Sequence, residues 1–450
     1  MGVNLDAVMG EITTRTSSGE RLAAPLKILH QAGWLAIGKV VQGGANLAAT
    51  LAVARHLGPA TFGRLSLAIA VASFVATASA LGLEHIATRE ISAARDAGIL
   101  RVLRRMRIIG ASLGCVLLLA ATQLPWIAEY GIRGLLTVLC LLPFSQIGDL
   151  AEWRLIADGQ SRRVAVVAML SSPVAAVARL TLALVGAGPV AFAWAFVAEW
   201  ALRSVLMIRS TRDKAAIAAE RTSAFIESAR AILRDSAPLL VAGIAVYVYM
   251  RIDQFMIAAM LGPKPVGLYS AMVALAEVPL VLPVLLLRAA LPTLTHQFES
   301  GSSQHEQTLV TLMRAGFFLH LILACAVSVA AEPIVALLYG GEFIGAATAL
   351  RIQLMAAPFV ALGVLSSAWL VLQRKTGHTV HRTSIGAVTN ILANLLLIPR
   401  YGIVGAALGT LIAQFVATYL VDALYPTTRV LFMMKTSALI PRLASTGVLK

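Results

Sequence analysis

Arg251 and Glu277 are oppositely charged residues in two long apolar stretches that flank one short turn. Each lies roughly ten residues from the turn, which places it ~15 Å along its helix at 1.5 Å per residue. That depth is near the middle of a hydrocarbon layer ~30 Å thick. A charge there costs at least ~2.5–3.5 kcal/mol, so it requires a partner or a water-filled cavity. Because a guanidinium binds phosphate oxygens through parallel hydrogen bonds, Arg251 is the first candidate for binding an anionic group.

Asp253 follows two residues after Arg251 and therefore lies on a different face of the same helix. Two interpretations remain open. Arg251 lines a central cavity and contacts substrate, or Arg251, Asp253 and Glu277 form a structural ion network.

Four cations fall within predicted spans, and each is a candidate for substrate binding: Arg251, Arg179, Arg203 and Lys39. Glu199 precedes Arg203 by four residues, so a local ion pair on one helix face is predicted, although a proton-linked role for Glu199 is an alternative. Lys39 either extends to the interface or meets substrate entering from inside. The candidate coupling or ion-pairing acids are Asp253, Glu277 and Glu199.

The remaining polar residues of the spans favour structural roles. His320 could titrate in a coupling step, but a hydrogen-bonded packing histidine is the better interpretation. Asn390 and Asn394 are predicted to hydrogen-bond between helices. The three cysteines have no metal-ligand spacing. We therefore expect no metal site and no cofactor, and leave a proton or a sodium ion open as the coupling ion.

Composition defines the protein class. Of the 450 residues, 58% are hydrophobic and 13% are charged, against about 25% charged in soluble domains. The mean hydropathy is +0.82, and the apolar runs are continuous rather than alternating. The sequence thus predicts an all-α polytopic membrane protein. Its net charge of +15 is explained by basic cytoplasmic loops, and no nucleic-acid partner is expected.

Twelve transmembrane helices are predicted, at 33–56, 65–84, 108–128, 132–153, 164–186, 189–208, 237–261, 266–287, 313–331, 344–372, 383–398 and 403–424. The tenth is long and is expected to be tilted or broken near Pro358. With the N-terminus inside, the outer segments hold only Arg55, Arg64, Arg133, Lys264, Arg351 and Arg400, while most of the 37 Lys and Arg residues lie inside or near the inner face. Both termini are therefore predicted to be cytoplasmic.

A short turn occurs twice, as LGPATFGRLS from Leu57 and LGPKPVGLYS from Leu261. Both copies follow an odd-numbered span, which indicates two parallel six-helix repeats of the kind found in secondary transporters. The predicted domains are a cytoplasmic segment 1–32, bundles 33–208 and 237–424, an amphipathic cytoplasmic linker 209–236, and a basic tail 425–450.

Three blocks carry a family resemblance. The stretch Ala54–Ser92 resembles the first helical hairpin of bacterial Wzx-type polysaccharide flippases, Tyr247–Glu277 resembles their seventh-to-eighth hairpin with its Arg-Ile-Asp-Gln run, and Ile398–Ala413 is similar to their eleventh-to-twelfth turn. This family belongs to the superfamily that includes MATE drug exporters and lipid II flippases. Lipid II flippases usually have fourteen spans, so a count of twelve favours the Wzx branch.

The resemblance implies translocation of undecaprenyl-pyrophosphate-linked oligosaccharide across the bacterial inner membrane by alternating access, for O-antigen, capsule or exopolysaccharide synthesis. Its implied partners are this lipid-linked glycan, membrane lipids and a polysaccharide polymerase. A MATE-like exporter of cationic small molecules is the alternative from the same fold. A polytopic glycosyltransferase or polymerase is disfavoured because the outer loops are too short for a catalytic constellation. No Walker-type phosphate loop is present, so we expect a transporter and not an enzyme.

Overall fold

The computed structural model describes residues 18–94, 97–211, 222–302, 304–375 and 377–440, and within these ranges every regular element is a helix. The first half consists of α2 (Ser18–Ser79), α3 (Leu83–Ala94), α4 (Ala97–Ala121), α5 (Pro125–Glu129), α6 (Arg133–Leu139), α7 (Leu142–Ser145), α8 (Asp149–Ala157), α9 (Ser161–Leu184) and α10 (Pro189–Ser210). The long helix α11 (Thr222–Leu261) follows.

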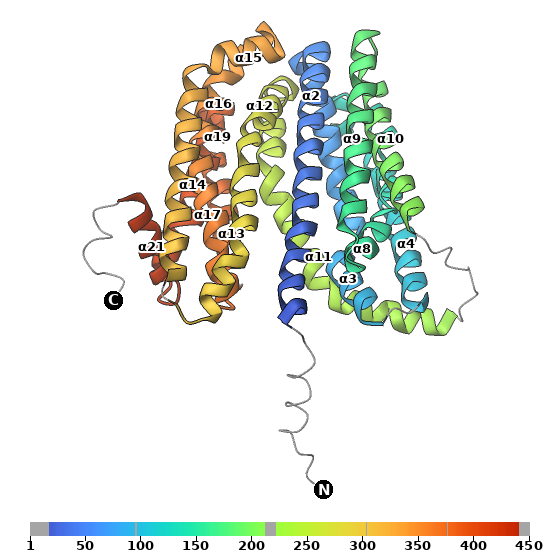
Figure 1. Ribbon diagram of the computed structural model, residues 1–450. Helices are drawn as coiled ribbons and strands as arrows, with labels where there is room; N and C mark the ends of the chain where they lie inside the picture. Colours follow the sequence, from blue (N-terminus) through green and yellow to red (C-terminus); the bar gives the residue numbers. More distant parts are fainter. Residues whose placement is uncertain (1–17, 95–96, 212–221, 303, 376, 441–450) are drawn as a thin grey trace.

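The second half comprises α12 (Pro263–Ala276), η1 (Val278–Leu280), α13 (Val281–Glu299), α14 (Gln304–Val329), α15 (Ala331–Tyr339), η2 (Gly341–Ala346), α16 (Ala347–Leu354), α17 (Ala357–Leu372), α18 (Gly377–Tyr401), α19 (Ile403–Phe415), the π-helical η3 (Val416–Leu420), α20 (Val421–Leu424) and α21 (Arg429–Leu439). In Figure 1 the helices up to α10 and those from α12 onward form two groups that stand side by side.

Nine helical segments of the described residues are long and apolar enough to cross a membrane. The first, Gly33–Ser79, contains the predicted span 33–56 and most of the predicted span 65–84. The predicted span 108–128 begins on α4 and runs into α5, and the span 383–398 lies on α18, and none of these helices is among the nine. The predicted break near Pro358 is confirmed, because α16 ends at Leu354 and α17 begins at Ala357. The span predicted at 132–153 is divided into α6, α7 and α8, which sequence reasoning missed.

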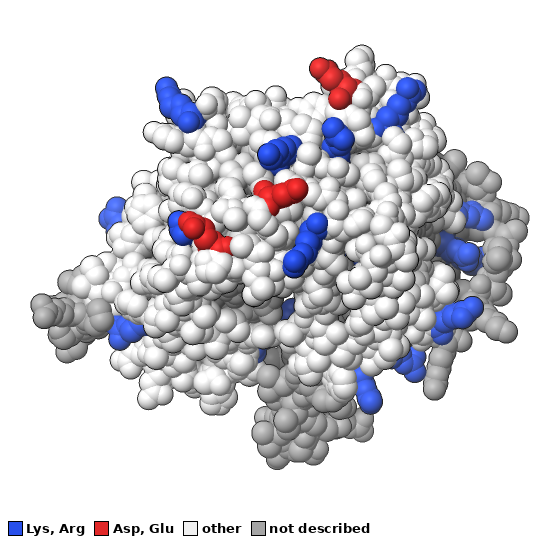
Figure 2. Space-filling view, turned by 90° about the horizontal axis from the view of Figure 1, so that it is seen from above, with Lys and Arg blue, Asp and Glu red and all other residues white. Residues whose placement is uncertain are grey.

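The outer surface of the helices is apolar. Leu184, Leu337 and Val329 are 78%, 73% and 85% exposed, and soluble monomers rarely expose contiguous apolar surface on this scale. Seen from the upper end of Figure 1, most of the surface carries no charge and only scattered acidic and basic side chains are visible (Figure 2). The exposed apolar side chains on the helices suit a hydrocarbon environment.

The two copies of the repeated turn have the same backbone geometry. Gly58 interrupts α2 with φ 70°, and Gly262 precedes α12 with φ 87°. Glycine enters this left-handed region without a Cβ penalty, so the chain reverses sharply between two apolar helices at each copy. The turns also contact each other, since a Cβ on Gly63 would lie 1.9 Å from the Pro263 carbonyl oxygen and one on Gly267 would lie 1.9 Å from that of Pro59. The two groups of helices are therefore tightly joined at their upper end.

Helix α11 connects the two groups. The amphipathic linker predicted at 209–236 lies partly outside the described residues (212–221), and its remainder from Thr222 is the first part of α11 and not a separate helix. This part runs along the lower end of the molecule in Figure 1. Ile232 is buried there in a cluster with Leu103 and Trp153. The rest of α11 carries Arg251 and Asp253, so one helix reaches from the lower end of the first group to the middle of the molecule.

Candidate functional site

A central cavity of about 950 Å³ lies between the two groups of helices. Its wall is formed by α2, α9, α10, α11, α12, η1 and α13. Phe62, Leu65 and Ser270 line it and lie within three residues of the glycines that join the repeated turns, so the glycine contact borders the cavity at its upper end. The volume is at the upper end of the ~300–1,000 Å³ typical of small-molecule sites.

Two cations in this wall have no partner among the described residues. Arg251 and Lys39 both line the cavity, and neither makes a hydrogen bond or ion pair with any residue that the structure describes. Glu277 also lines the cavity and is exposed. Because the two cations are available to contact a ligand, the wall can bind an anionic group without first breaking a bond within the described part of the chain.

Arg179 is held differently. Its guanidinium donates to the Glu199 carboxylate, both side chains are 10% exposed, and the Phe196 ring lies 5.6 Å from the guanidinium carbon. Arg179 and Glu199 both line the cavity. They contribute a neutral ion pair to its wall, so Arg179 adds less positive charge than the sequence indicated.

The predicted local pair of Glu199 with Arg203 is wrong. Arg203 Nη2 donates to Glu152 Oε2 at 2.8 Å, and the Arg203 side chain is 12% exposed. It is not among the residues that line the central cavity. The structure therefore corrects the placement of Arg203 in the substrate site, because α8 supplies this arginine with a partner away from the cavity.

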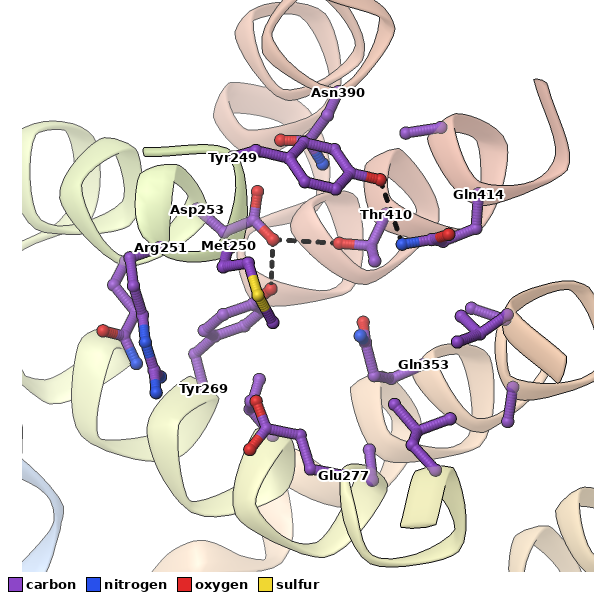
Figure 3. A pocket seen from close by; sticks show the side chains of 18 residues that line it. Tyr249, Met250, Arg251, Asp253, Tyr269, Glu277, Gln353, Asn390, Thr410 and Gln414 are labelled. Atoms are coloured by element: carbon purple, nitrogen blue, oxygen red, sulfur yellow. Dashed lines mark hydrogen bonds between the residues drawn. The ribbon is translucent and has the colours of Figure 1, made fainter. Parts of the chain in front are cut away.

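Asp253 lies in a second, smaller pocket of about 120 Å³ between α11 and the second group of helices. Tyr269 donates to Asp253 Oδ2 at 2.5 Å and Thr410 donates to the same oxygen at 2.9 Å, while Asn394 Nδ2 donates to Oδ1 at 2.6 Å. Figure 3 shows Asp253 directed toward Tyr269 and Thr410, whereas Arg251 points away from α11 in another direction. The expected difference in face between Arg251 and Asp253 is thus confirmed.

Side chains from four helices meet at the Asp253 carboxylate, with Asp253 on α11, Tyr269 on α12, Asn394 on α18 and Thr410 on α19. Gly409 makes room for the amide, since a Cβ there would lie 2.3 Å from Asn394 Oδ1. The prediction that Asn390 and Asn394 hydrogen-bond between helices is confirmed for Asn394, which also donates to Asn390 Oδ1 at 3.2 Å.

Some oxygen atoms around the pocket have no donor among the described residues. They are Asn394 Oδ1 and Gln353 Oε1, both of which are buried, and Gln353 lines the pocket with Asp253. The Asp253 carboxylate accepts from a phenol, a hydroxyl and an amide N–H, and with the phenol and hydroxyl oxygens beside it this carboxylate could hold a proton or a small hard cation. Sequence reasoning located Asp253 but missed Tyr269 and Thr410. The available signal was that a buried carboxylate needs hydrogen-bond donors from its neighbours.

Arg251 and Glu277 line both the cavity and the Asp253 pocket. They form no ion pair with each other or with Asp253, so the structural ion network considered for these three residues is not present as direct ion pairs among the described side chains. Glu277 ends α12, at a break in the second helix of its hairpin. The two sites therefore share a wall that contains one cation and one acid without an ion-pair partner in the described ranges.

Comparisons with known proteins agree with this architecture. A solved structure of lipid II flippase MurJ in an inward closed conformation is 14% identical, with 90% of this chain and 90% of that chain covered and a TM-score of 0.69. An inward-facing multidrug resistance MATE family transporter of the MOP superfamily is 17% identical, with 90% and 96% covered and a TM-score of 0.67. A MOP superfamily transporter from Pyrococcus furiosus is 16% identical, with 93% and 96% covered and a TM-score of 0.56. Among curated protein sequences, none matches this chain.

The chain has the fold of these membrane transporters and is a multi-pass membrane protein. The model of the family described as polysaccharide biosynthesis protein matches residues 28–298. The chain therefore belongs to this polysaccharide biosynthesis family. This confirms the family resemblance, and the blocks Ala54–Ser92 and Tyr247–Glu277 lie within the matched residues.

Proposed function

We propose that the protein is a flippase that moves undecaprenyl-pyrophosphate-linked oligosaccharide units from the cytoplasmic to the periplasmic leaflet of a bacterial inner membrane. The observation that carries the proposal is the central cavity, whose wall holds two cations, Lys39 and Arg251, that have no partner in the described part of the chain. A pyrophosphate is a strong ligand for a free guanidinium. Family membership supports polysaccharide synthesis as the process, which includes O-antigen, capsule or exopolysaccharide.

In this proposal the twelve predicted spans form two parallel six-helix repeats, 33–208 and 237–424, and alternating access is a movement of one against the other. The lower end of the molecule faces the cytoplasm, together with both chain termini. The head group enters the cavity from that end while the contact between Gly63 and Gly267 is closed. Separation of the two turns then opens the cavity to the periplasm, where a polysaccharide polymerase uses the product.

Asp253 is the proposed coupling residue. The residue is buried at 8% exposure, and the ions it would bind are a proton or sodium. An ion bound at Asp253 changes the net charge of the site where α11, α12, α18 and α19 meet, and α11 also carries Arg251. Binding of an ion at Asp253 is thereby linked to the position of the cation that contacts substrate.

A MATE-like exporter of cationic small molecules is the second candidate, because the solved structures of the same fold include MATE transporters. Glu277 would then bind the cation. The charge of the wall disfavours this alternative, since among the described groups without an ion-pair partner Lys39 and Arg251 outnumber Glu277 and would repel a cationic ligand.

The test is a direct comparison of substrates in proteoliposomes. The purified protein is assayed with a fluorescent undecaprenyl-pyrophosphate oligosaccharide and, in parallel, with a fluorescent organic cation. We expect flipping of the lipid-linked glycan and no transport of the cation above protein-free vesicles. Transport of the cation without any movement of the glycan would overturn the proposal and favour the exporter.

A further inference from the structure

Aromatic side chains follow one face of α10 where this helix borders the central cavity. Phe192, Phe196 and Trp200 are spaced four residues apart, and all three line the cavity. Residues four apart lie above one another on a helix, so the rings form one stripe along ~12 Å of α10 at 1.5 Å per residue. Phe192 is buried at 2% exposure, whereas Phe196 and Trp200 are only partly buried. The latter two rings therefore offer surface to a ligand.

The Trp200 indole is held from the side that faces away from the cavity. The guanidinium carbon of Arg203 lies 5.5 Å from the centroid of the Trp200 ring, and Arg203 is itself bound to Glu152. Trp200 lines the cavity, but Arg203 and Glu152 do not. The arginine thus covers the rear of the indole and leaves its cavity side free. An indole fixed in this way is a platform that needs little ordering when a ligand binds.

Two polar side chains on α2 line the same cavity. Gln42 and Asn46 are four residues apart, so they share one face of the helix. Both are partly buried, and neither side chain forms a hydrogen bond with a residue that the structure describes. Helices α2 and α10 pack against each other. Two carboxamides, each with an acceptor oxygen and two N–H donors, are therefore available in the cavity that the aromatic stripe lines.

An aromatic surface together with free carboxamides suits a sugar ring. One face of a pyranose consists of C–H groups, and these pack well on the negative face of an aromatic ring. Each sugar hydroxyl both donates and accepts, so two neighbouring hydroxyls match the oxygen and the N–H of one amide. A pyrophosphate has only acceptor oxygens, and a polyprenyl chain has no polar group. The pattern therefore fits the carbohydrate part of a ligand better than its phosphate or its lipid.

The charges in this part of the wall favour an uncharged sugar. Arg179 and Glu199 line the cavity, but they are paired with each other, and Glu199 directly precedes Trp200. A carboxylated sugar stacked on Trp200 would bring a second negative charge to Glu199, and like charges repel strongly away from bulk water. The cations Lys39 and Arg251 bind the pyrophosphate in the proposed function, so neither is left for such a sugar.

We propose that Trp200 and Phe196, together with Gln42 and Asn46, form a subsite for a neutral sugar unit. Trp200 is the stacking platform, and the two amides bind sugar hydroxyls. This subsite distinguishes a glycosylated lipid from the bare polyprenyl pyrophosphate, whereas Arg251 binds both. The assignment to a lipid-linked ligand rests on the proposed flippase function. Sugar and pyrophosphate then contact different helices, because the subsite lies on α2 and α10 and Arg251 lies on α11.

Sugar preference is measured by binding, without transport. Native mass spectrometry of the purified full chain compares undecaprenyl pyrophosphate with the same lipid carrying glucose, galactose or N-acetylglucosamine. We expect at least one of these glycolipids to bind about 10-fold more tightly than the bare lipid, through stacking and one or two hydrogen bonds. Trp200→Leu and the double variant Gln42→Ala/Asn46→Ala should bring this ratio close to one. Equal binding of the bare lipid and all the glycolipids to wild type would refute the subsite.

Trp194→Leu is the matched control, because Trp194 is on the same helix, is 51% exposed and does not line the cavity. It should keep the wild-type ratio. Trp200→Phe retains an aromatic face and should keep part of the preference, so this variant and the amide double variant carry the test if Trp200→Leu fails to fold. A wild-type ratio in the amide variant and in the Trp200 variant that folds would mean that these side chains do not bind sugar.

Glucose and glucuronic acid differ only at C6 and test the preference for a neutral sugar. We expect the glucuronic acid lipid to bind more weakly than the glucose lipid, and tighter binding would contradict this part of the proposal. Arg251→Ala separates the subsite from the flippase function, because it should weaken the bare and the glycosylated lipid by the same factor. Sugar preference in a protein that flips no lipid would contradict the flippase proposal but support the subsite. Normal flipping of the bare and the glycosylated lipid at one rate, in wild type and Trp200→Leu alike, would do the reverse.

Discussion

Gly63 and Gly267 each pack against the turn that contains the other, and a Cβ on either would lie 1.9 Å from a carbonyl oxygen of the opposite turn. The two residues occupy the same position in the two copies of the repeated motif. This reciprocal contact borders the central cavity at its upper end, and only glycine permits the approach.

Substitution of either glycine by alanine should therefore open the upper end. The methyl group forces the two helices apart, and such overpacking destabilises the closed state by about 1–3 kcal/mol. We expect Gly63→Ala and Gly267→Ala to raise the reactivity of a cysteine placed at Ser270, a cavity-lining position. The measurement is labelling by a membrane-impermeant thiol reagent in a background without native cysteines.

Gly134→Ala is the matched control for this opening. Gly134 is helical in α6, and a methyl group added there would have no described neighbour within 4 Å, so its substitution should leave labelling unchanged. Equal labelling in all variants would mean that the glycine contact does not control access.

If Asp253 binds the coupling ion, a neutral substitution at this position should abolish ion coupling and leave the fold intact. Asp253→Asn removes the charge but keeps a group that can hydrogen-bond with Tyr269 and Thr410. We expect the variant to fold with a melting temperature close to wild type, and its flipping rate to become insensitive to imposed proton and sodium gradients. Asp158→Asn, on a carboxylate that is 41% exposed, should retain the gradient response of wild type.

The pair of Arg179 and Glu199 should be strongly coupled. Removal of one partner leaves the other charge buried, and breaking buried pairs costs roughly 3–5 kcal/mol. We expect Glu199→Gln and Arg179→Met each to destabilise the protein more than the double variant does, measured by denaturation in detergent. The exposed pair of Arg89 and Glu90, with 61% and 32% side-chain exposure, is the control and should show much weaker coupling, because solvent screens its charges. Additive effects at Arg179 and Glu199 would contradict the ion pair.

At the lower end, a buried triad joins one acid to two cations, so removal of the acid should cost more stability than removal of one cation. Asp422 accepts from Lys435 Nζ at 2.8 Å and from Arg382 Nε at 2.7 Å, and it is 1% exposed. Asp422→Asn leaves two cations without their counter-charge, so we expect a larger fall in melting temperature than in Lys435→Met, which leaves Arg382 and Asp422 paired. A fall of equal size in both variants would argue against the triad.

The sequence predicted the depth of the charged residues correctly, but it did not predict which residues form ion pairs with them. The positions of Arg251, Asp253 and Glu277 in the middle of the molecule follow from counting along apolar helices. Glu199 was assigned to Arg203 because the rule that residues four apart share a helix face considers only one isolated helix. In the fold, α9 brings Arg179 to Glu199 and α8 brings Glu152 to Arg203, and such contacts between distant segments cannot be read from spacing.

Much of the helical architecture was predictable because its signals are local in the sequence. Apolar length and Gly-Pro turns are local signals, and they located the reversal at Gly58 and the break near Pro358. The triad of Arg382, Asp422 and Lys435 was missed because basic residues near span ends resemble ordinary cytoplasmic charge. Their burial depends on α21 packing back onto the helices, which composition does not reveal.

The most direct test of the flippase proposal is the rate at which Arg251 variants flip a fluorescent undecaprenyl-pyrophosphate oligosaccharide in proteoliposomes. We expect Arg251→Ala to be inactive and Arg251→Lys to be impaired, because lysine keeps the charge but loses the forked geometry. Arg400→Ala, on an exposed arginine that donates to the Leu396 carbonyl of its own helix, should flip at the wild-type rate. Wild-type rates in both well-folded Arg251 variants would contradict the assignment of Arg251 as the pyrophosphate ligand.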